Sequence, residues 1–360
     1  DRQGRREVGS RCGETMHVEM LRTWLITIVS WIHTVLFVIA CGIYEADNAK
    51  LSSFRMTYPT ASQKMNMAHA IPTELYKYMN ASTGFKVLAN NTLRWSTPGT
   101  LNDPHDMQFA LRLNIDKSRL KALSLDKLWE SIYGNVPLEQ DNLIGMTFGK
   151  LRGRFPKFSR KRFDEEFGEA IEEGFLAMER QLPAFHAEVE ALVATSKILC
   201  LTDRIDDVLM WSHYADSHRG IVTGFRVVPE LDSPWTEARP VNYVDEIPEL
   251  FEEDLLSDVV SGRRNLDSTK SLRKHVYTKS KAWAYEREHR IFSGSGRNPL
   301  AAYEDLPFHP LELSKVVFGC RMSHDQRERF SHLVKSKYPH AEIMIMERNP
   351  GDFGLNLKPW

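Results

Sequence analysis

Residues 198–228, ILCLTDRIDDVLMWSHYADSHRGIVTGFRVV, decide the fold class. The apolar runs Ile198–Leu201 and Ile221–Val228 each predict a buried strand. Between them, Asp207 is a typical N-cap for a short helix that ends before Gly220. A strand, a helix and a second strand in so short a stretch indicate a fold that mixes both kinds of element.

Outward from this stretch, strands and helices continue to alternate over residues 73–346. Residues 117–198 differ, because apolar residues recur there at helical spacing over Leu120–Tyr133 and Arg162–Leu199. Pro183 is expected to kink or split the second of these helices, and Gly145–Phe158 is expected to be a linker. We therefore expect a single α+β domain with a mixed or antiparallel sheet core, a helical insertion at about 117–198 and a C-terminal tail over 347–360. The remaining predicted elements are Glu74–Met79, Phe85–Asn91, Thr92–Thr97, Phe109–Ile115, Val241–Val244, Leu250–Lys281, Ala284–Ser293, Leu313–Phe318, Asp325–Tyr338 and Ala341–Met346.

The composition is ordinary for a globular protein, with 42% hydrophobic residues in 360 and a formal net charge of -1. Such a charge gives no overall attraction to nucleic acid or to anionic membranes. The four cysteines show no C-x-x-C spacing and no zinc-binding arrangement with histidines, so we predict no metal and no disulfide framework. A reducing compartment suits the main domain, which is expected to be cytoplasmic.

The segment Trp24–Tyr44 is almost free of charge and is long enough to cross a hydrocarbon core of ~30 Å. Val38-Ile-Ala-Cys41 also resembles a lipoprotein processing site, with Cys41 as the lipidated residue. The main domain would then be membrane-anchored or lipidated, if this segment is genuine. Residues 1–66 share no periodic pattern with the rest of the chain, so an over-extended reading frame is an equal alternative, and we keep them out of the fold prediction.

The segment Trp283-Ala-Tyr-Glu286-Arg-Glu288-His-Arg290 carries the strongest functional signal. Alternate residues of a strand share a face, so Glu286, Glu288 and Arg290 are expected to point one way, with Trp283 at the same parity. Two carboxylates at this spacing can hold a ribose diol or act as an acid/base pair, because their repulsion separates their pKa values. A solvated strand face with ion pairs is the alternative.

Three further groups of residues carry weaker signals. The helix around Trp211 and Tyr214 could line a site, or could be a core helix with polar ends. The turn Asn102–Asp106 could bind a cation or anchor a site, or could simply be a hydrogen-bonded turn. The stretch Lys150–Arg162 interleaves cations with phenylalanines, which suits a nucleic-acid backbone, although a solvated helical hairpin explains it as well.

Several of these segments, in this order, resemble a bacterial family known as domain of unknown function 2971. The resemblance covers roughly residues 73–346 and leaves out residues 1–66. The family has no established reaction, so the resemblance identifies related proteins but does not imply a mechanism. The matching segments are Leu75–Tyr78, Leu93–Ser96, Asn102–Pro104, Met210–Gly220, Lys281–Arg290 and Gly319–Ser323.

The chain also resembles ADP-ribosyltransferases of the class that has an arginine on the first strand, a serine-threonine-serine strand and a later E-x-E pair. The resemblance implies NAD as substrate. It implies that Lys77 and Ser96 bind NAD, together with Arg290 lining the cleft, that Tyr214 or Trp283 stacks on nicotinamide, and that Glu288 and Glu286 are catalytic. Lys77 departs from the usual arginine or histidine, and Pro98 stands where the second serine is expected.

The leading hypothesis is therefore an NAD-dependent, ADP-ribosyltransferase-like enzyme of a bacterial defence or conflict system, acting on a macromolecular target. One alternative is a metal-dependent nuclease that uses Asp103, Asp106 and the Glu286–Glu288 pair. Another is a non-catalytic sensor or adaptor that binds nucleic acid through Lys150–Arg162. The chain contains no phosphate-binding loop, dinucleotide fingerprint, serine hydrolase elbow or H-E-x-x-H motif.

Overall fold

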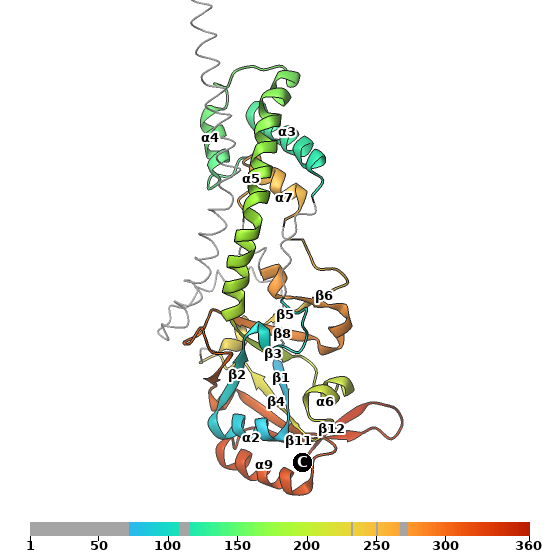
Figure 1. Ribbon diagram of the computed structural model, residues 1–360. Helices are drawn as coiled ribbons and strands as arrows, with labels where there is room; N and C mark the ends of the chain where they lie inside the picture. Colours follow the sequence, from blue (N-terminus) through green and yellow to red (C-terminus); the bar gives the residue numbers. More distant parts are fainter. Residues whose placement is uncertain (1–71, 108–114, 232, 250, 267–272) are drawn as a thin grey trace, which may run out of the picture. The chain divides into compact units, whose positions relative to one another are not determined.

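The computed structural model describes residues 72–107, 115–231, 233–249, 251–266 and 273–360 (Figure 1). It confirms an α+β fold and divides the chain into two compact units. Unit 1 contains the described residues within Phe109–Glu190 and Pro248–His275, and unit 2 those within Tyr44–Gln108, Ala191–Ile247 and Val276–Trp360. The predicted helical insertion thus belongs to a separate unit, which also includes residues 248–275 from later in the sequence.

Unit 2 is built on a ten-stranded sheet with the order β12-β11-β10-β4-β1-β3-β2-β9, to which β8 adds beside β3 and β5 beside β8. Only β10 and β11 run parallel among the paired strands of this sheet, so the core is mixed and mainly antiparallel, as predicted. The strands are β1 (Glu74–Met79), β2 (Thr92–Ser96), β3 (Lys197–Thr202), β4 (Ile221–Arg226), β5 (Arg239–Pro240), β8 (Glu288–Ser293), β9 (Tyr303–Pro307), β10 (Leu313–Phe318), β11 (Glu342–Arg348) and β12 (Leu355–Pro359).

Helices cover both faces of this sheet, which explains why its central strands β4 and β10 bury apolar residues on both faces. On one face α2 (Ala81–Asn90) and α9 (His324–Lys337) lie side by side over a core that includes Ile221 and Val316. On the other face α6 (Val208–Tyr214) packs its Trp211 against Val222 and Val317. Alternate residues of β4 and β10 therefore supply the two cores, since successive side chains of a strand point to opposite faces.

The connection from α6 to β4 is tightly constrained. The Asp207 side chain accepts hydrogen bonds from the backbone N–H groups of the first turn of α6, as its N-cap position predicts. After the helix, the residues from Asp216 to His218 all have positive φ angles. The chain then passes Gly220, where a Cβ atom would lie 2.2 Å from the Met79 carbonyl oxygen. Only glycine fits here, so this turn fixes where β4 begins.

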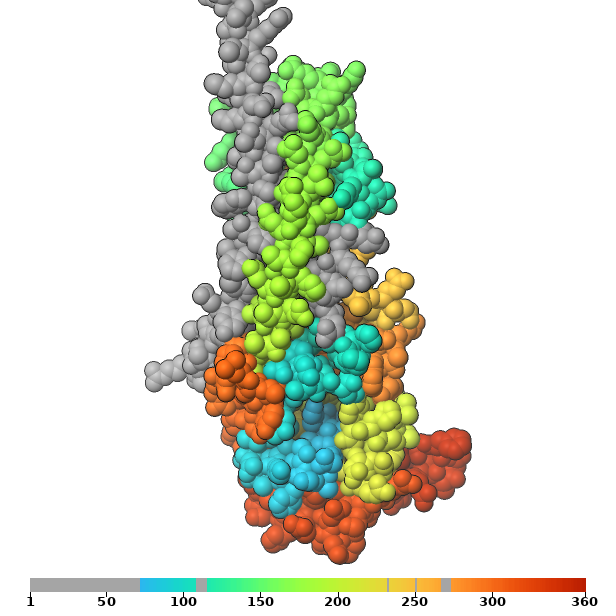
Figure 2. Space-filling model, in the orientation of Figure 1, coloured from blue at the N-terminus to red at the C-terminus, as the bar shows by residue number. Residues whose placement is uncertain are grey.

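Unit 1 is helical and is held together by packed aromatic rings. Its helices are α3 (Lys117–Tyr133), α4 (Leu143–Leu151), α7 (Glu253–Val260) and most of α5 (Arg160–Thr195), which continues into the range of unit 2. Figure 2 shows α5 beside α3, and the rings of Phe163 and Trp129 meet edge to face between them with centroids 5.1 Å apart. The linker predicted over Gly145–Phe158 is wrong in its first half, which belongs to α4, because the Asn142 side chain caps a helix there.

Other local predictions need correction. Pro183 lies inside α5 without splitting it. Within the long helix predicted over 250–281, the described residues form α7, a helical turn at 273–276 and then β7 (Thr278–Ser280), which pairs in parallel with β6 (Asn242–Val244). The tail expected over 347–360 includes β12, a strand of the main sheet. The strand predicted at Phe109–Ile115 and the segment Trp24–Tyr44 lie outside the described residues, except for Ile115; within the described ranges, no helix is long and apolar enough to cross a membrane.

Candidate functional site: a buried carboxylate cluster

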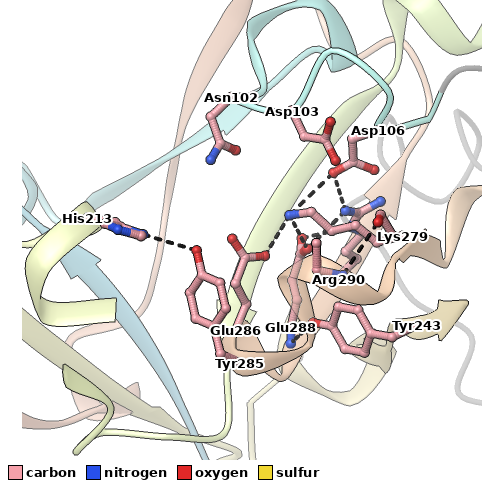
Figure 3. A network of polar contacts seen from close by, with 12 residues as sticks. Asn102, Asp103, Asp106, His213, Tyr243, Lys279, Tyr285, Glu286, Glu288 and Arg290 are labelled. Atoms are coloured by element: carbon pink, nitrogen blue, oxygen red, sulfur yellow. Dashed lines mark hydrogen bonds and ion pairs between the residues drawn. The ribbon is translucent and has the colours of Figure 1, made fainter. Parts of the chain in front are cut away.

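Five charged side chains gather inside unit 2 (Figure 3). They come from the turn after the 3-10 helix η2 (Pro98–Thr100), from β7, from the end of the 3-10 helix η4 (Lys281–Glu286) and from β8. None is more than 6% exposed, which is unusual because charges are rarely buried unless they are paired. The members of this carboxylate cluster are Asp106, Lys279, Glu286, Glu288 and Arg290.

The backbone at Arg287 brings the two glutamates together. Its φ of 42° is left-handed and ends η4, so Glu286 belongs to a helical turn and Glu288 is the first residue of β8. The prediction that Glu286, Glu288 and Arg290 share one face of a single strand is therefore wrong in its first residue. Strand alternation does align Glu288 with Arg290, and the left-handed turn returns Glu286 to the same cluster.

Lys279 links the three carboxylates. Its Nζ atom lies 2.6 Å from Oε2 of Glu286, 3.3 Å from Oε2 of Glu288 and 3.5 Å from Oδ2 of Asp106. The same ammonium lies 5.0 Å from the ring centroid of Trp283. One cation thus holds carboxylates that would otherwise repel one another in a medium of low dielectric constant.

Arg290 makes the closest pairing with Glu288. Its Nε donates to Oε1 at 2.7 Å and its Nη2 to Oε2 at 2.9 Å, in the two-pronged geometry that favours arginine over lysine. Nη2 also donates to Oδ2 of Asp106 at 2.5 Å, and Nη1 to the Val276 carbonyl at 2.8 Å. Arg290 is completely enclosed by these partners.

The carboxylate oxygens differ in their remaining capacity for hydrogen bonds. Glu288 accepts two hydrogen bonds from Arg290, one from Lys279 and one from the Cys200 thiol, and four is about the limit for a carboxylate. Glu286 accepts only from Lys279 and from the Tyr214 hydroxyl. Oδ1 of Asp106 is buried and has no hydrogen-bond partner. Glu288 is therefore saturated, whereas Glu286 can still engage another group.

The two glutamates have opposite pKa shifts. Burial raises the pKa of Glu286 above its usual range, and the opposing effects of Lys279 and Tyr214 do not cancel it. Burial also acts to raise the pKa of Glu288, but the charge and hydrogen bonds of Arg290, with the charge of Lys279, outweigh it and lower the pKa to about 2. One carboxylate thus stays charged at all ordinary pH values while its neighbour binds a proton more readily, the pattern of an acid/base pair.

Polar and aromatic groups surround Glu286 and Glu288. The Tyr214 hydroxyl donates to Oε1 of Glu286 and accepts from Nδ2 of Asn102 at 2.8 Å. The Tyr243 hydroxyl accepts from the backbone N–H of Glu288 at 2.7 Å. Beside them, the Tyr285 hydroxyl lies 3.0 Å from Nδ1 of His213 (Figure 3). Asn102 and His213 are exposed, and Tyr214 is half-buried, so this side of the cluster approaches solvent.

The structure brings together five of the seven predicted site residues, namely Glu286, Glu288, Arg290, Tyr214 and Trp283. The other two, Lys77 and Ser96, are occupied elsewhere. Nζ of Lys77 donates to the Cys200 carbonyl at 2.7 Å and so links β1 to β3. Ser96 lies on β2, paired with Ile198 and Tyr303, and makes none of the cluster's hydrogen bonds.

Two residues of the cluster were not among the predicted site residues. Lys279 shares the parity of Glu286 and Glu288 in the sequence, which is a weak signal that could have included it. Asp106 belongs to the turn Asn102–Asp106, which was identified only as a possible anchor. Its contact with Arg290 joins residues 184 positions apart, and no local pattern encodes such a contact.

The groups named in the alternative hypotheses are occupied by other contacts. No set of three or more histidine, cysteine or acidic residues within the described ranges could hold a metal ion, and in the carboxylate cluster two protein cations stand between the carboxylates. In the stretch Lys150–Arg162, Phe155 and Phe158 are buried in unit 1 instead of being presented for stacking. Arg160 pairs with Asp126 and Asp164, and Arg152 donates to backbone carbonyls.

Comparison with known proteins supports one of the two resemblances. A family model described as "Protein of unknown function (DUF2971)" matches residues 210–291, a range that contains most of α6, all of β4 and every member of the carboxylate cluster except Asp106. The resemblance expected over residues 73–346 is thus confirmed for this segment. No curated protein and no solved structure matches the chain, and the ADP-ribosyltransferase resemblance gains no support.

Proposed function

We propose that unit 2 is a glycosyl-transferring enzyme that breaks the bond between nicotinamide and ribose in NAD, with Glu286 as its acid/base group. The opposite pKa shifts of Glu286 and Glu288 around one lysine carry the proposal. A buried pair arranged only for stability would hold both carboxylates firmly charged. Glu286 instead keeps a raised pKa, which brings a carboxyl closer to the operating range of a general base at neutral pH.

Glu288 has a different role in this proposal. Its oxygens are saturated by Arg290, Lys279 and Cys200, so it has little capacity left for a substrate hydroxyl. Its lasting negative charge can still stabilise the positive charge that develops on a ribose as its glycosidic bond breaks. We therefore assign the proton transfer to Glu286 and the electrostatic stabilisation to Glu288.

The choice of NAD follows from the E-x-E pattern and from two aromatic side chains. Tyr214 and Trp283 are half-buried and each contacts a member of the carboxylate cluster, so a planar nicotinamide ring could stack on either. The cluster also has one carboxylate more than it has cations, which favours a donor whose departing ring carries positive charge. Lys77 and Ser96 take no part in this proposal, because both contact other groups.

The test is release of nicotinamide by the purified full chain incubated with NAD, alone and with protein and nucleic-acid mixtures as acceptors. Glu286→Gln keeps the shape of the side chain but cannot take up a proton, so it should lower kcat by about 10²–10⁴-fold. Glu288→Gln should also lower kcat, since it removes the stabilising charge.

The matched control is Glu347→Gln, which changes an exposed glutamate of β11 that pairs only with Lys358. This variant should release nicotinamide at the parental rate. The proposal is wrong if the parent protein releases none under any of these conditions, or if Glu286→Gln is as active as the parent.

A further inference from the structure

Glu286 is almost completely buried, and each of its carboxylate oxygens has a hydrogen-bond partner. The side chain is 3% exposed, and its Oε2 atom is bound to Lys279. Its Oε1 atom accepts a hydrogen bond from the Tyr214 hydroxyl, a close contact that no other side chain shares. The Tyr214 hydroxyl can therefore deliver a proton to Oε1 along an existing hydrogen bond.

The direction of hydrogen bonding at Tyr214 is fixed by its second partner. Nδ2 of Asn102 lies 2.8 Å from the phenol oxygen, and an amide nitrogen can only donate. The phenol oxygen thus accepts from Asn102 and must point its own hydrogen toward Glu286. Asn102 is exposed and Tyr214 is half-buried, so a chain of hydrogen bonds leads from the surface of unit 2 to a buried carboxylate.

We propose that Tyr214, and not Glu286 itself, is the catalytic residue that receives the acceptor's proton, with Glu286 as the base behind it and Asn102 as a positioning residue. The proposal rests on the proposed function, in which an acceptor hydroxyl attacks the ribose of NAD. The ADP-ribosyltransferase resemblance implies that Tyr214 or Trp283 stacks on nicotinamide, and the Tyr214 hydroxyl supplies a second role.

The transfer balances in a single step. The acceptor oxygen gives an electron pair to C1′ of the ribose while the C1′–N bond breaks, and the electrons of that bond neutralise the departing nicotinamide ring. The acceptor's proton passes to the oxygen of Tyr214 as the hydrogen of Tyr214 passes to Oε1 of Glu286. Tyr214 ends as a neutral phenol and Glu286 as a carboxylic acid. Glu286 then returns its proton to water by the same relay, through Tyr214.

The electrostatics of the site suit such a relay. Burial, followed by the hydrogen bond and charge of Glu286, raises the pKa of Tyr214, so its hydroxyl keeps a proton at neutral pH and can only exchange it. The ionisable groups that face Glu286 include Lys279, Glu288 and Tyr214, together with the phenols of Tyr243 and Tyr285. Because Glu286 must be ionised to receive a proton, kcat should rise with pH through its raised pKa.

The first test compares Tyr214→Phe with the matched control Tyr285→Phe. Tyr214→Phe keeps the ring and any stacking, so KM should change little while kcat falls about 10²–10⁴-fold. Among the described residues, the Tyr285 hydroxyl forms a hydrogen bond with His213 and none with a carboxylate, so its removal should leave nicotinamide release at the parental rate. Asn102→Ala, a change at an exposed residue, should lower kcat about 2- to 10-fold, the worth of one hydrogen bond.

The second test needs no substrate. The infrared band of the protonated Glu286 carboxyl, identified by its absence in Glu286→Gln, can be followed after transfer of the protein to D₂O below the pKa of this group. The relay predicts that exchange slows in Tyr214→Phe and stays at the parental rate in Tyr285→Phe. This readout also applies if Tyr214→Phe shows no activity.

The two tests separate the relay from the proposed function. If the parent does not cleave NAD but Tyr214→Phe slows carboxyl exchange, NAD is not the substrate and the relay stands. If the parent cleaves NAD and Tyr214→Phe matches it in kcat, pH profile and exchange rate, the proposed function stands and the relay is wrong.

Discussion

Glu286 and Glu288 lie two residues apart and share Lys279, yet their pKa values move in opposite directions. The cause lies in their other partners. Arg290 contributes two hydrogen bonds and a full charge to Glu288, whereas Glu286 receives a neutral hydroxyl from Tyr214. A charged donor stabilises a carboxylate far more than a neutral one does, and this difference outweighs the cost of burial for Glu288 alone.

The opposite shifts predict opposite effects of pH on stability. The pKa of Glu288 is lowered from 4.5 to about 2, so its contribution is complete above pH 4.5 and is lost as pH falls toward 2. The pKa of Glu286 is raised, so its ionisation lowers stability as pH rises from 4.5 through the raised value. The free energy of unfolding, measured with urea across this pH range, should therefore fall less toward low pH in Glu288→Gln than in the parent. In Glu286→Gln it should fall less than in the parent as pH rises above 4.5.

The parent chain and Glu347→Gln provide the comparison for these slopes, since Glu347 is exposed. Equal pH dependence in all four proteins would contradict the assigned pKa shifts. Glu288→Gln should also be less stable than Glu286→Gln at neutral pH, because it leaves the buried guanidinium of Arg290 with only Asp106 as an anionic partner at hydrogen-bond distance.

At the scale of the secondary-structure elements, the carboxylate cluster depends on how η4 ends and β8 begins. A continuous strand over residues 284–293 would place Glu286 and Glu288 on one face by alternation, as the sequence predicts. The helical turn places them together by another route, in which a left-handed residue at Arg287 reverses the chain. The pairing of β8 with β3 then fixes Glu288 opposite Thr202 and Arg290 opposite Cys200.

The turn from α6 to β4 supplies a prediction at this scale. In Gly220→Ala the added Cβ would lie 2.2 Å from the Met79 carbonyl oxygen and 2.9 Å from that of Ala215, and neither backbone atom can move freely. We expect this variant to lose about 1–3 kcal/mol of unfolding free energy, the usual cost of overpacking. Thermal or urea unfolding measures the loss.

Gly99→Ala is the matched control, since no atom lies within 4 Å of the Cβ it would add. Its stability should stay within about 0.5 kcal/mol of the parent. Because α6 carries Tyr214, Gly220→Ala should also lower nicotinamide release. Equal stability of the two variants would show that the turn is not constrained as described.

At the scale of the whole molecule, the chain forms two units with separate cores. The core of unit 1 contains packed rings, including Phe163 and Phe167 with centroids 4.6 Å apart, whereas Trp211 is enclosed in unit 2. Separate cores can unfold in separate transitions, as they often do in proteins of more than one domain.

Truncating one core at a time tests this division. Phe163→Ala should lower the melting temperature of one calorimetric transition, and Trp211→Ala that of the other, each with a loss of about 3–5 kcal/mol. Below the first transition, Phe163→Ala should still release nicotinamide, since every residue of the carboxylate cluster belongs to unit 2. A single transition that shifts equally in both variants would contradict the division.

The sequence by itself determined the α+β class and most local elements, because these depend on neighbouring residues. Apolar runs and alternating stretches predicted strands at the positions of β1, β2, β3, β4, β10 and β11, and the Asp207 cap predicted the start of α6. The same reasoning singled out Glu286, Glu288 and Arg290. This reasoning did not predict the boundary between η4 and β8, because no sequence pattern indicates that Arg287 adopts a left-handed backbone conformation.

Only the tertiary structure decided which distant groups complete the carboxylate cluster. It added Asp106 from the turn after η2 and Asn102 beside Tyr214, and it engaged Lys77 with the Cys200 carbonyl. These contacts join residues 112 to 184 positions apart in the sequence. They depend on which strands pair and on where the turns place the chain. The free energy of packing the whole sheet therefore selects these contacts, and the conformational preferences of neighbouring residues do not.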